Sequence, residues 1–207
     1  MQKILLALVG IIFISACLGA PEVYKIKFAG MDVNFRADLN KAEKISLEPG
    51  TGAVKEIMFT NPVNLVRLAF VPDENNTGFY SVAGFEIQYK TVLAYKQYIF
   101  TDKAITQTED GLQCVYFEKQ TGVIATQRKI CFETVVLNST DEAAAMANET
   151  APVILMEASA ESTKVSVDGS LIRIMGKDMS QTNRKYTDLD LAADKFLLAL
   201  LNESIRR

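Results

Sequence analysis

The chain of 207 residues carries 22 Lys and Arg against 25 Asp and Glu, so its formal net charge is −3, and 49% of its residues are hydrophobic. With no excess of basic residues, it lacks the broad cationic surface that nucleic acid requires. It contains no histidine, which excludes Ser-His-Asp and Cys-His nucleophiles, His-ligated zinc and His general bases. We expect no nucleic-acid partner, no metal and no cofactor.

The N-terminus is typical of a secretory signal peptide. A single basic residue, Lys3, precedes the uninterrupted apolar run at 4–14, ILLALVGIIFI. As a helix, residues 4–20 would reach only about 26 Å, which is short of a hydrocarbon core of ~30 Å. We therefore expect residues 1–16 to be a cleaved signal peptide rather than a membrane-spanning helix, which leaves 21 basic and 25 acidic residues in the mature chain.

The end of this run carries a short motif, Ile14-Ser15-Ala16-Cys17. It resembles the lipobox of prokaryotic lipoproteins, and the resemblance covers only this N-terminal segment. It implies cleavage before Cys17, a diacylglycerol on the Cys17 sulfur, and attachment to the outer face of the cytoplasmic membrane. Two acyl chains give stable anchoring where one does not. An uncleaved anchor and cleavage at another position are the alternatives.

Residues 17–136 read as a mainly β domain. Three segments alternate apolar and polar residues and predict half-buried antiparallel strands, namely EVYKIKF at 22–28, NLVRLAFV at 64–71 and GFEIQYK at 84–90. Residues 51–62, TGAVKEIMFTNP, have helical spacing instead, with Thr51 as the expected N-cap and Pro62 as the stop. The fold class we expect is α+β.

Aromatic residues are dense between residues 79 and 100. They are Phe79, Tyr80, Phe85, Tyr89, Tyr95, Tyr98 and Phe100. Aromatics of a strand can form a stacking platform for sugars or peptides, but alternation in this segment favours a core role. If a binding surface exists, we expect it where tyrosines of this segment point outward.

The segment that contains Cys114 and Cys131 predicts a disulfide-linked β-hairpin. A two-residue loop of Gly122 and Val123 suits a type II′ turn, and it pairs Thr121 with Ile124 and so places Cys114 opposite Cys131. The same register puts one apolar set on one face, Val115, Phe117, Ile130 and Phe132. Two reduced core cysteines are the alternative, favoured only in a cytosolic chain.

The remainder divides into a polar linker at 137–151 and a ββα-like module at 152–207. The module comprises a strand PVILMEA, a hairpin around Asp168-Gly169, and a helix DLDLAADKFLLALL preceded by a Thr187/Asp190 capping box. One helix stripe should be buried on the sheet: Leu189, Ala193, Phe196, Leu197 and Leu200. Asp188, Asp190 and Asp194 could offer carboxylates to calcium, but their first-turn position explains them without a metal.

Four Asn-x-Ser/Thr triplets predict N-glycosylation, at Asn75, Asn138, Asn148 and Asn202. Polar loops rich in Asn, Ser and Thr are the alternative explanation. A lipobox together with such triplets is more typical of an archaeal than of a bacterial cell surface.

These observations favour an exported, membrane-anchored lipoprotein with a non-catalytic binding or structural role, whose partners are the membrane and envelope proteins or polymers. An accessory subunit of a membrane complex is the second class, and it predicts an exposed apolar patch on the C-terminal module. A hydrolase based on carboxylates is the third class, and it predicts two acids close together in a cleft. We expect no enzymatic activity.

Overall fold

The structure, a computed structural model, describes residues 24–60, 63–73, 75–99, 101, 103–121, 124–180 and 186–201. The expected signal peptide at 1–16, Cys17, Asn202, the expected helix stop Pro62 and the expected hairpin loop Gly122-Val123 lie outside these residues.

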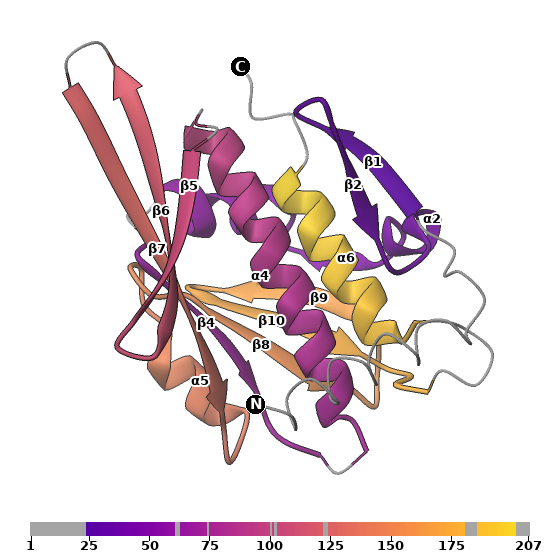
Figure 1. Ribbon diagram of the computed structural model, residues 1–207. Helices are drawn as coiled ribbons and strands as arrows, with labels where there is room; N and C mark the ends of the chain where they lie inside the picture. The colour runs from indigo at the N-terminus through magenta and orange to yellow at the C-terminus, as the bar shows by residue number, and fades with distance from the viewer. Residues whose placement is uncertain are drawn as a thin grey trace, which may run out of the picture.

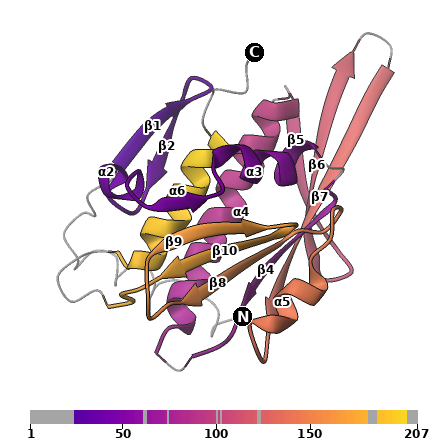
Figure 2. The same ribbon diagram turned by 180° about the vertical axis from the view of Figure 1, so that it is seen from behind.

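An eight-stranded mixed sheet forms the centre of the molecule (Figures 1 and 2). Its strands in chain order are β3 (Ser46–Glu48), β4 (Leu65–Phe70), β5 (Lys103–Glu109), β6 (Leu112–Thr121), β7 (Ile124–Val136), β8 (Val153–Ala158), β9 (Lys164–Asp168) and β10 (Leu171–Gly176). They lie in the order β3-β9-β10-β8-β4-β7-β6-β5. A separate hairpin pairs β1 (Tyr24–Phe28) with β2 (Met31–Phe35).

The helices are α2 (Leu39–Ala42), α3 (Thr51–Lys55), which continues into a π-helical turn at Glu56–Thr60, α4 (Thr77–Ile99), α5 (Asp141–Met146) and α6 (Asp188–Leu201). Helices α4 and α6 lie side by side across one face of the sheet (Figure 1). The fold is therefore α+β, as expected.

The central strands are buried on both faces, which explains their nearly continuous apolar sequences. On the face of α4 and α6, Val66, Leu68 and Ile154 join the main core. On the opposite face, Ala69 and Leu155 pack with Ala143 of α5. Strands covered on both sides do not need polar residues at alternate positions.

The sheet is continuous across the two modules expected from the sequence. Strand β4 of the N-terminal region hydrogen-bonds in parallel to both β7 and β8. The expected linker at 137–151 contains α5 and connects β7 to β8, which run in the same direction. Parallel strands need such a crossover, and its small residue Ala143 allows α5 to pack closely on the sheet.

The prediction of a strand at residues 84–90 is wrong, because this segment lies within α4. The buried residues Tyr80, Ala83, Ile87 and Ala94 follow the spacing i, i+3, i+7 and i+14 of a helix face. Alternation over only seven residues did not distinguish this pattern from a strand.

Two further expectations are corrected. Strand β4 does form at the expected place, but both of its neighbours are parallel, so the expected antiparallel pairing is wrong. The N-cap of α3 is Gly50 rather than Thr51, and Thr51 is already helical. Gly50 has a φ of +148°, a conformation that favours glycine over residues with a side chain.

Several local expectations are confirmed. Cys114 and Cys131 form a disulfide, with Cα atoms 3.9 Å apart, and the register from Thr121↔Ile124 to Cys114↔Cys131 is the expected one. The expected apolar face of this hairpin is buried. In the capping box, the Thr187 N–H donates to Asp190 Oδ2 at 2.7 Å and the Asp190 N–H donates to Thr187 Oγ1 at 3.2 Å. All five residues of the expected stripe of α6 are buried.

Candidate functional site

A groove of about 670 Å³ lies between α4 and the sheet. Strands β4, β6, β7 and β8 and the β5–β6 turn contribute to it. Its apolar lining comprises Leu68, Phe70, Tyr80, Gly84, Phe85, Leu112, Phe132 and Met156. Its polar lining comprises Ser81, Gln88, Asp110, Gly111, Gln113, Glu133 and Thr134. Apolar and polar residues thus line the groove in similar numbers.

Gly84 leaves room on the floor of this groove. A Cβ atom built at this position would lie 3.4 Å from Met156 Cε and 3.9 Å from Leu68 Cδ1. These are ordinary van der Waals distances, so no steric conflict demands glycine here. Glycine in a helix interior costs about 1 kcal/mol relative to alanine, so this residue weakens α4.

The aromatic residues of α4 divide between the core and the surface. Tyr80 stacks on Phe70, with ring centroids 5.4 Å apart, and it is buried. Tyr95 is buried, and its hydroxyl donates to the Met58 carbonyl. Phe85 and Tyr89, in contrast, are 69% and 56% exposed and lie about one helical turn apart, and of the two only Phe85 lines the groove.

The sequence suggested outward tyrosines as the place to search, and Tyr89 and Tyr98 are of this kind. The exposed large hydrophobic residues in the described part of the chain are Met31, Phe85, Tyr89, Tyr98, Ile105 and Val136. None of them belongs to the described residues of the C-terminal module. Three of them, Phe85, Tyr89 and Tyr98, lie on α4.

The charged groups at the groove are acidic. Asp110 is exposed at the β5–β6 turn, and Glu133 is bound to Arg67, whose Nε lies 2.9 Å from Glu133 Oε2. Burial raises the pKa of Tyr80, and the charges of Asp73 and Glu157 raise it further against the effect of a backbone hydrogen bond at Ala158. The described lining contains no Lys or Arg, and of its two acids only Glu133 forms an ion pair that the structure shows, with Arg67.

One side-chain hydrogen bond joins α4 to β6 beside the groove. Gln88 Nε2 donates to Gln113 Oε1 at 2.7 Å. Both side chains line the groove, and their remaining amide groups can pair with a bound backbone or side chain.

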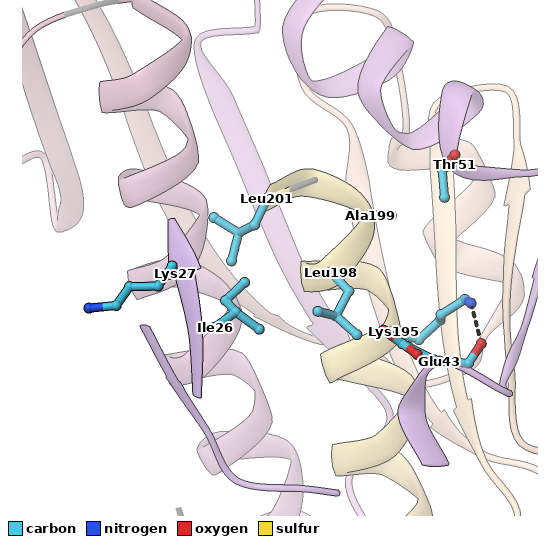
Figure 3. Close-up of a pocket in the computed structure, with 8 residues that line it drawn as sticks. All are labelled: Ile26, Lys27, Glu43, Thr51, Lys195, Leu198, Ala199 and Leu201. Carbon is cyan, nitrogen blue, oxygen red and sulfur yellow. Dashed lines mark hydrogen bonds between the residues drawn. The ribbon is translucent and has the colours of Figure 1, made fainter. Parts of the chain in front are cut away.

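A second pocket, of about 480 Å³, lies between β1, α2, α3 and α6 (Figure 3). Ile26 points toward Leu198 and Leu201, whereas the Lys27 side chain points away from them. Its two ammonium groups already have partners: Lys195 Nζ donates to the Glu43 carbonyl at 2.7 Å, and Lys27 Nζ lies 2.6 Å from Asp32 Oδ1. Because both ammonium groups are already bonded, we consider this pocket a weaker candidate for a ligand site than the groove at α4.

The three acids of α6 considered for calcium each have a separate structural partner. Asp188 Oδ2 accepts from Thr163 Oγ1 and from the Asp178 N–H, and Asp190 accepts from Thr187. Asp194 Oδ2 accepts from the Ala37 N–H at 3.0 Å. Among the described residues, the carboxylate of Glu109 lies near Cys114 and Cys131, but the disulfide removes both thiolates and Glu109 pairs with Lys129.

Asp194 belongs to a buried charged cluster between α4 and α6. The pKa of Asp194 is raised to about 7, chiefly by burial and in smaller part by the charges of Asp190 and Glu86. The Lys90 ammonium and the Ala37 N–H act in the opposite direction. Lys90 is buried, bonds to Glu86 and lies 4.2 Å from the centroid of the Phe35 ring. This cluster joins β2 and α2 to both long helices and has a structural role.

The described glycosylation triplets lie at the surface. Asn75, Asn138 and Asn148 are all exposed. Asn138 Nδ2 donates to Glu142 Oε1 at 3.3 Å, whereas Asn148 uses its Oδ1 to accept from Thr150 and Ala151.

Comparison of the chain with protein-family models, curated proteins and solved structures finds no match. Within the part of the chain that the structure describes, no helix combines the length and the apolar character needed to cross a bilayer.

Proposed function

We propose that this protein is an exported lipoprotein, anchored through Cys17 to the outer face of the cytoplasmic membrane, that binds an apolar ligand in the groove at α4. The observation that carries the proposal is the groove itself, a cavity of about 670 Å³ at α4 whose lining includes the 69% exposed Phe85.

Two features support export. The Cys114–Cys131 disulfide is of a kind that persists in oxidising compartments and is rare in the cytosol. The N-terminal residues resemble a lipoprotein signal, with Cys17 at the end of the apolar run. Exposed Asn75, Asn138 and Asn148 are compatible with N-glycosylation of a cell-surface protein.

Binding is favoured over hydrolysis by carboxylates. Of the two acids that line the groove, Glu133 is bound to Arg67, so an acid pair free to act on a substrate is not available there. A role as an accessory subunit is the second candidate, and the exposed Phe85 and Tyr89 on α4 favour it.

The intact mass of the protein extracted from its native membrane tests anchoring. We expect the mass of a chain that begins at Cys17 and carries a glycerolipid. The mass added by the lipid should be absent from the Cys17→Ser variant. Reduction of the disulfide should add the mass of two hydrogen atoms. Hexose increments would locate glycosylation, to be assigned by Asn→Gln variants at the three exposed sites. Retention of Met1 with no lipid would overturn the proposal of a lipoprotein.

Binding to the groove can be tested with N-phenyl-1-naphthylamine, an uncharged aromatic probe whose fluorescence increases in apolar sites. The mature chain with Cys17→Ser should bind it, and Gly84→Leu should weaken binding at least about tenfold by filling the floor. Gly78→Leu is the matched control, because Gly78 lies on the same helix in open space. Phe85→Ser tests the rim without disturbing the core. Equal probe binding by all four proteins would refute a ligand site here.

A further inference from the structure

We propose that two copies of this chain associate through β5, an edge strand of the large sheet, to form a symmetric dimer with one continuous sheet. The inference goes beyond ligand binding at α4 and does not depend on it. Three features of β5 support it: its open edge, the direction of its backbone groups and the order of its charges.

The edge of the sheet at β5 is long, regular and uncovered. All seven residues of β5 pair with β6 in an unbroken register, and no described strand lies on the other side of β5. The centre of the strand, residues 105–108, is exposed and contains no charge and no proline. The opposite edge, β3, has only three residues and is followed directly by Pro49. Short strands and proline protect an edge from pairing with another chain, and β5 has neither protection.

The unpaired backbone groups of β5 belong to alternate residues. Cys114 and Cys131 are 3.9 Å apart at Cα, much closer than the ~5.5 Å of a hydrogen-bonded pair, so their backbones do not bond to each other. The backbone of Cys114 therefore bonds to its partner on β5, which is Gln107. Because this direction alternates along a strand, the residues next to Gln107 point their N–H and C=O groups away from β6. The outward-pointing residues are Ala104, Thr106 and Thr108.

A second copy of β5 matches this edge in an antiparallel register centred on Thr106. When Thr106 lies opposite its own counterpart on the two-fold axis, every residue of β5 has a partner. Ala104 then lies opposite Thr108 of the second copy, so all the outward N–H and C=O groups are bonded. Ile105, which is 39% exposed, lies diagonally opposite its own counterpart, and association also removes its apolar surface from water.

The charges of β5 favour the same register and the same occupant. Lys103 and Glu109 lie on one face of the strand, equally far from Thr106, so each lysine lies opposite the glutamate of the other copy. Within one copy, Lys103 is already paired with Glu118, and Glu109 with Lys129. The dimer joins these pairs into rows of alternating charge. A register shifted along the strand loses this match, whereas two copies of one strand produce it by symmetry alone.

The oligomeric state of the mature chain with Cys17→Ser tests the inference, measured by sedimentation equilibrium at low salt. We expect a reversible equilibrium between monomer and dimer. Amide hydrogen exchange measured by NMR should locate the interface. In a mostly dimeric sample, exchange at Ala104, Thr106 and Thr108 should slow at least about tenfold, whereas Ile105 and Gln107, which already bond to β6, should change little.

Reversal of the end charges tests the register. Lys103→Glu should weaken the dimer about tenfold at low salt, because it places glutamates opposite one another at both ends of the interface. The double variant Lys103→Glu/Glu109→Lys should dimerise more tightly than Lys103→Glu, although it brings like charges together within each copy. Lys27→Glu is the matched control, because Lys27 also pairs with an acid across an antiparallel hairpin, Asp32, but lies in β1. It should leave the dimer unchanged.

Thr106→Pro tests the edge itself. It removes the outward N–H on the two-fold axis but no bond to β6, so it should abolish the dimer while the monomer keeps its circular dichroism spectrum. The charge variants decide the question if this variant does not fold. A monomer at every concentration up to about 1 mM would overturn the inference. A dimer that Thr106→Pro leaves intact, or a double charge variant weaker than Lys103→Glu, would also overturn it. Probe binding at α4 is measured separately and is unaffected by these outcomes.

Discussion

The two long helices cover the same face of the sheet in different ways. Nearly every apolar residue of α6 is buried, and its N-terminus is held by the Thr187 capping box. Helix α4 buries Lys90 and Thr91 together with its apolar residues, and it also exposes Phe85 and Tyr89 to solvent. The difference indicates that α6 serves the core alone, whereas α4 contributes both to the core and to the exposed apolar side chains of the surface.

The largest expected difference in stability is between a variant that truncates a buried aromatic residue of α6 and one that truncates an exposed aromatic residue of α4. Phe196→Ala should destabilise the fold by about 3–5 kcal/mol, because Phe196 is fully buried and its removal leaves a cavity. Phe85→Ala should change stability by less than about 0.5 kcal/mol, since the side chain is 69% exposed. Urea denaturation measures both. A similar loss in the two variants would mean that Phe85 belongs to the core.

Replacement of glycine by alanine should change stability in opposite directions at Gly176 and at Gly84. At Gly176 in β10, a Cβ atom would lie 2.5 Å from the Leu189 backbone nitrogen, so Gly176→Ala should cost about 1–3 kcal/mol as α6 is pushed from the sheet. At Gly84, where a Cβ fits, Gly84→Ala should stabilise by about 0.5–1 kcal/mol. Thermal unfolding of both variants gives the two signs. Loss of stability in Gly84→Ala would show that α4 has no room at the groove floor.

A smaller effect on stability is expected from replacing Asp194, whose carboxyl group is buried between α4 and α6. The folded-state pKa of Asp194 is raised to about 7 from its ordinary 3.8, so its contribution favours the folded state at low pH and is lost as pH rises through 7. Asp194→Asn should therefore be more stable than the parent protein at pH 8 by about 1–2 kcal/mol, with the Ala37 N–H still bonded to an amide oxygen. At pH 4 the two should differ little.

Urea denaturation between pH 4 and pH 8 measures this difference, with Asp168→Asn as an exposed control on the surface. The comparison is made across the whole cluster, because Lys90, Glu86 and Asp190 also act on Asp194. If the parent protein and Asp194→Asn keep the same difference at every pH, the pKa of Asp194 is the same in the folded and unfolded chain, and the Lys90 ammonium offsets burial.

Features that depend on neighbours in sequence were predictable. The register of the Cys114–Cys131 hairpin followed from its turn, the cysteine pair and the alternation of its residues, all within one short segment. The capping box of α6 followed from Thr187 and Asp190 alone. Helix α4 was missed because its sheet-facing residues and its exposed aromatics together gave no clear period in a short window.

The candidate site was not predictable in the same way. The groove needs Phe70 of β4, Phe132 of β7 and Met156 of β8 to lie beside Gly84 of α4, and no local pattern indicates that β4 is inserted between β7 and β8. Asp110 could be recognised from the sequence as a turn residue, but not as a charge at the mouth of a groove.

The sequence by itself determined the α+β class, the disulfide hairpin and the capped C-terminal helix, because short-range geometry and side-chain periodicity decide these features. It also carries the lipoprotein-like N-terminus, which is a motif and needs no fold to be read. Only the tertiary structure decided that one sheet unites both halves of the chain and that α4 exposes part of its apolar surface. These features arise from contacts between residues far apart in sequence, whose pairing depends on which faces remain to be buried once the local elements have formed.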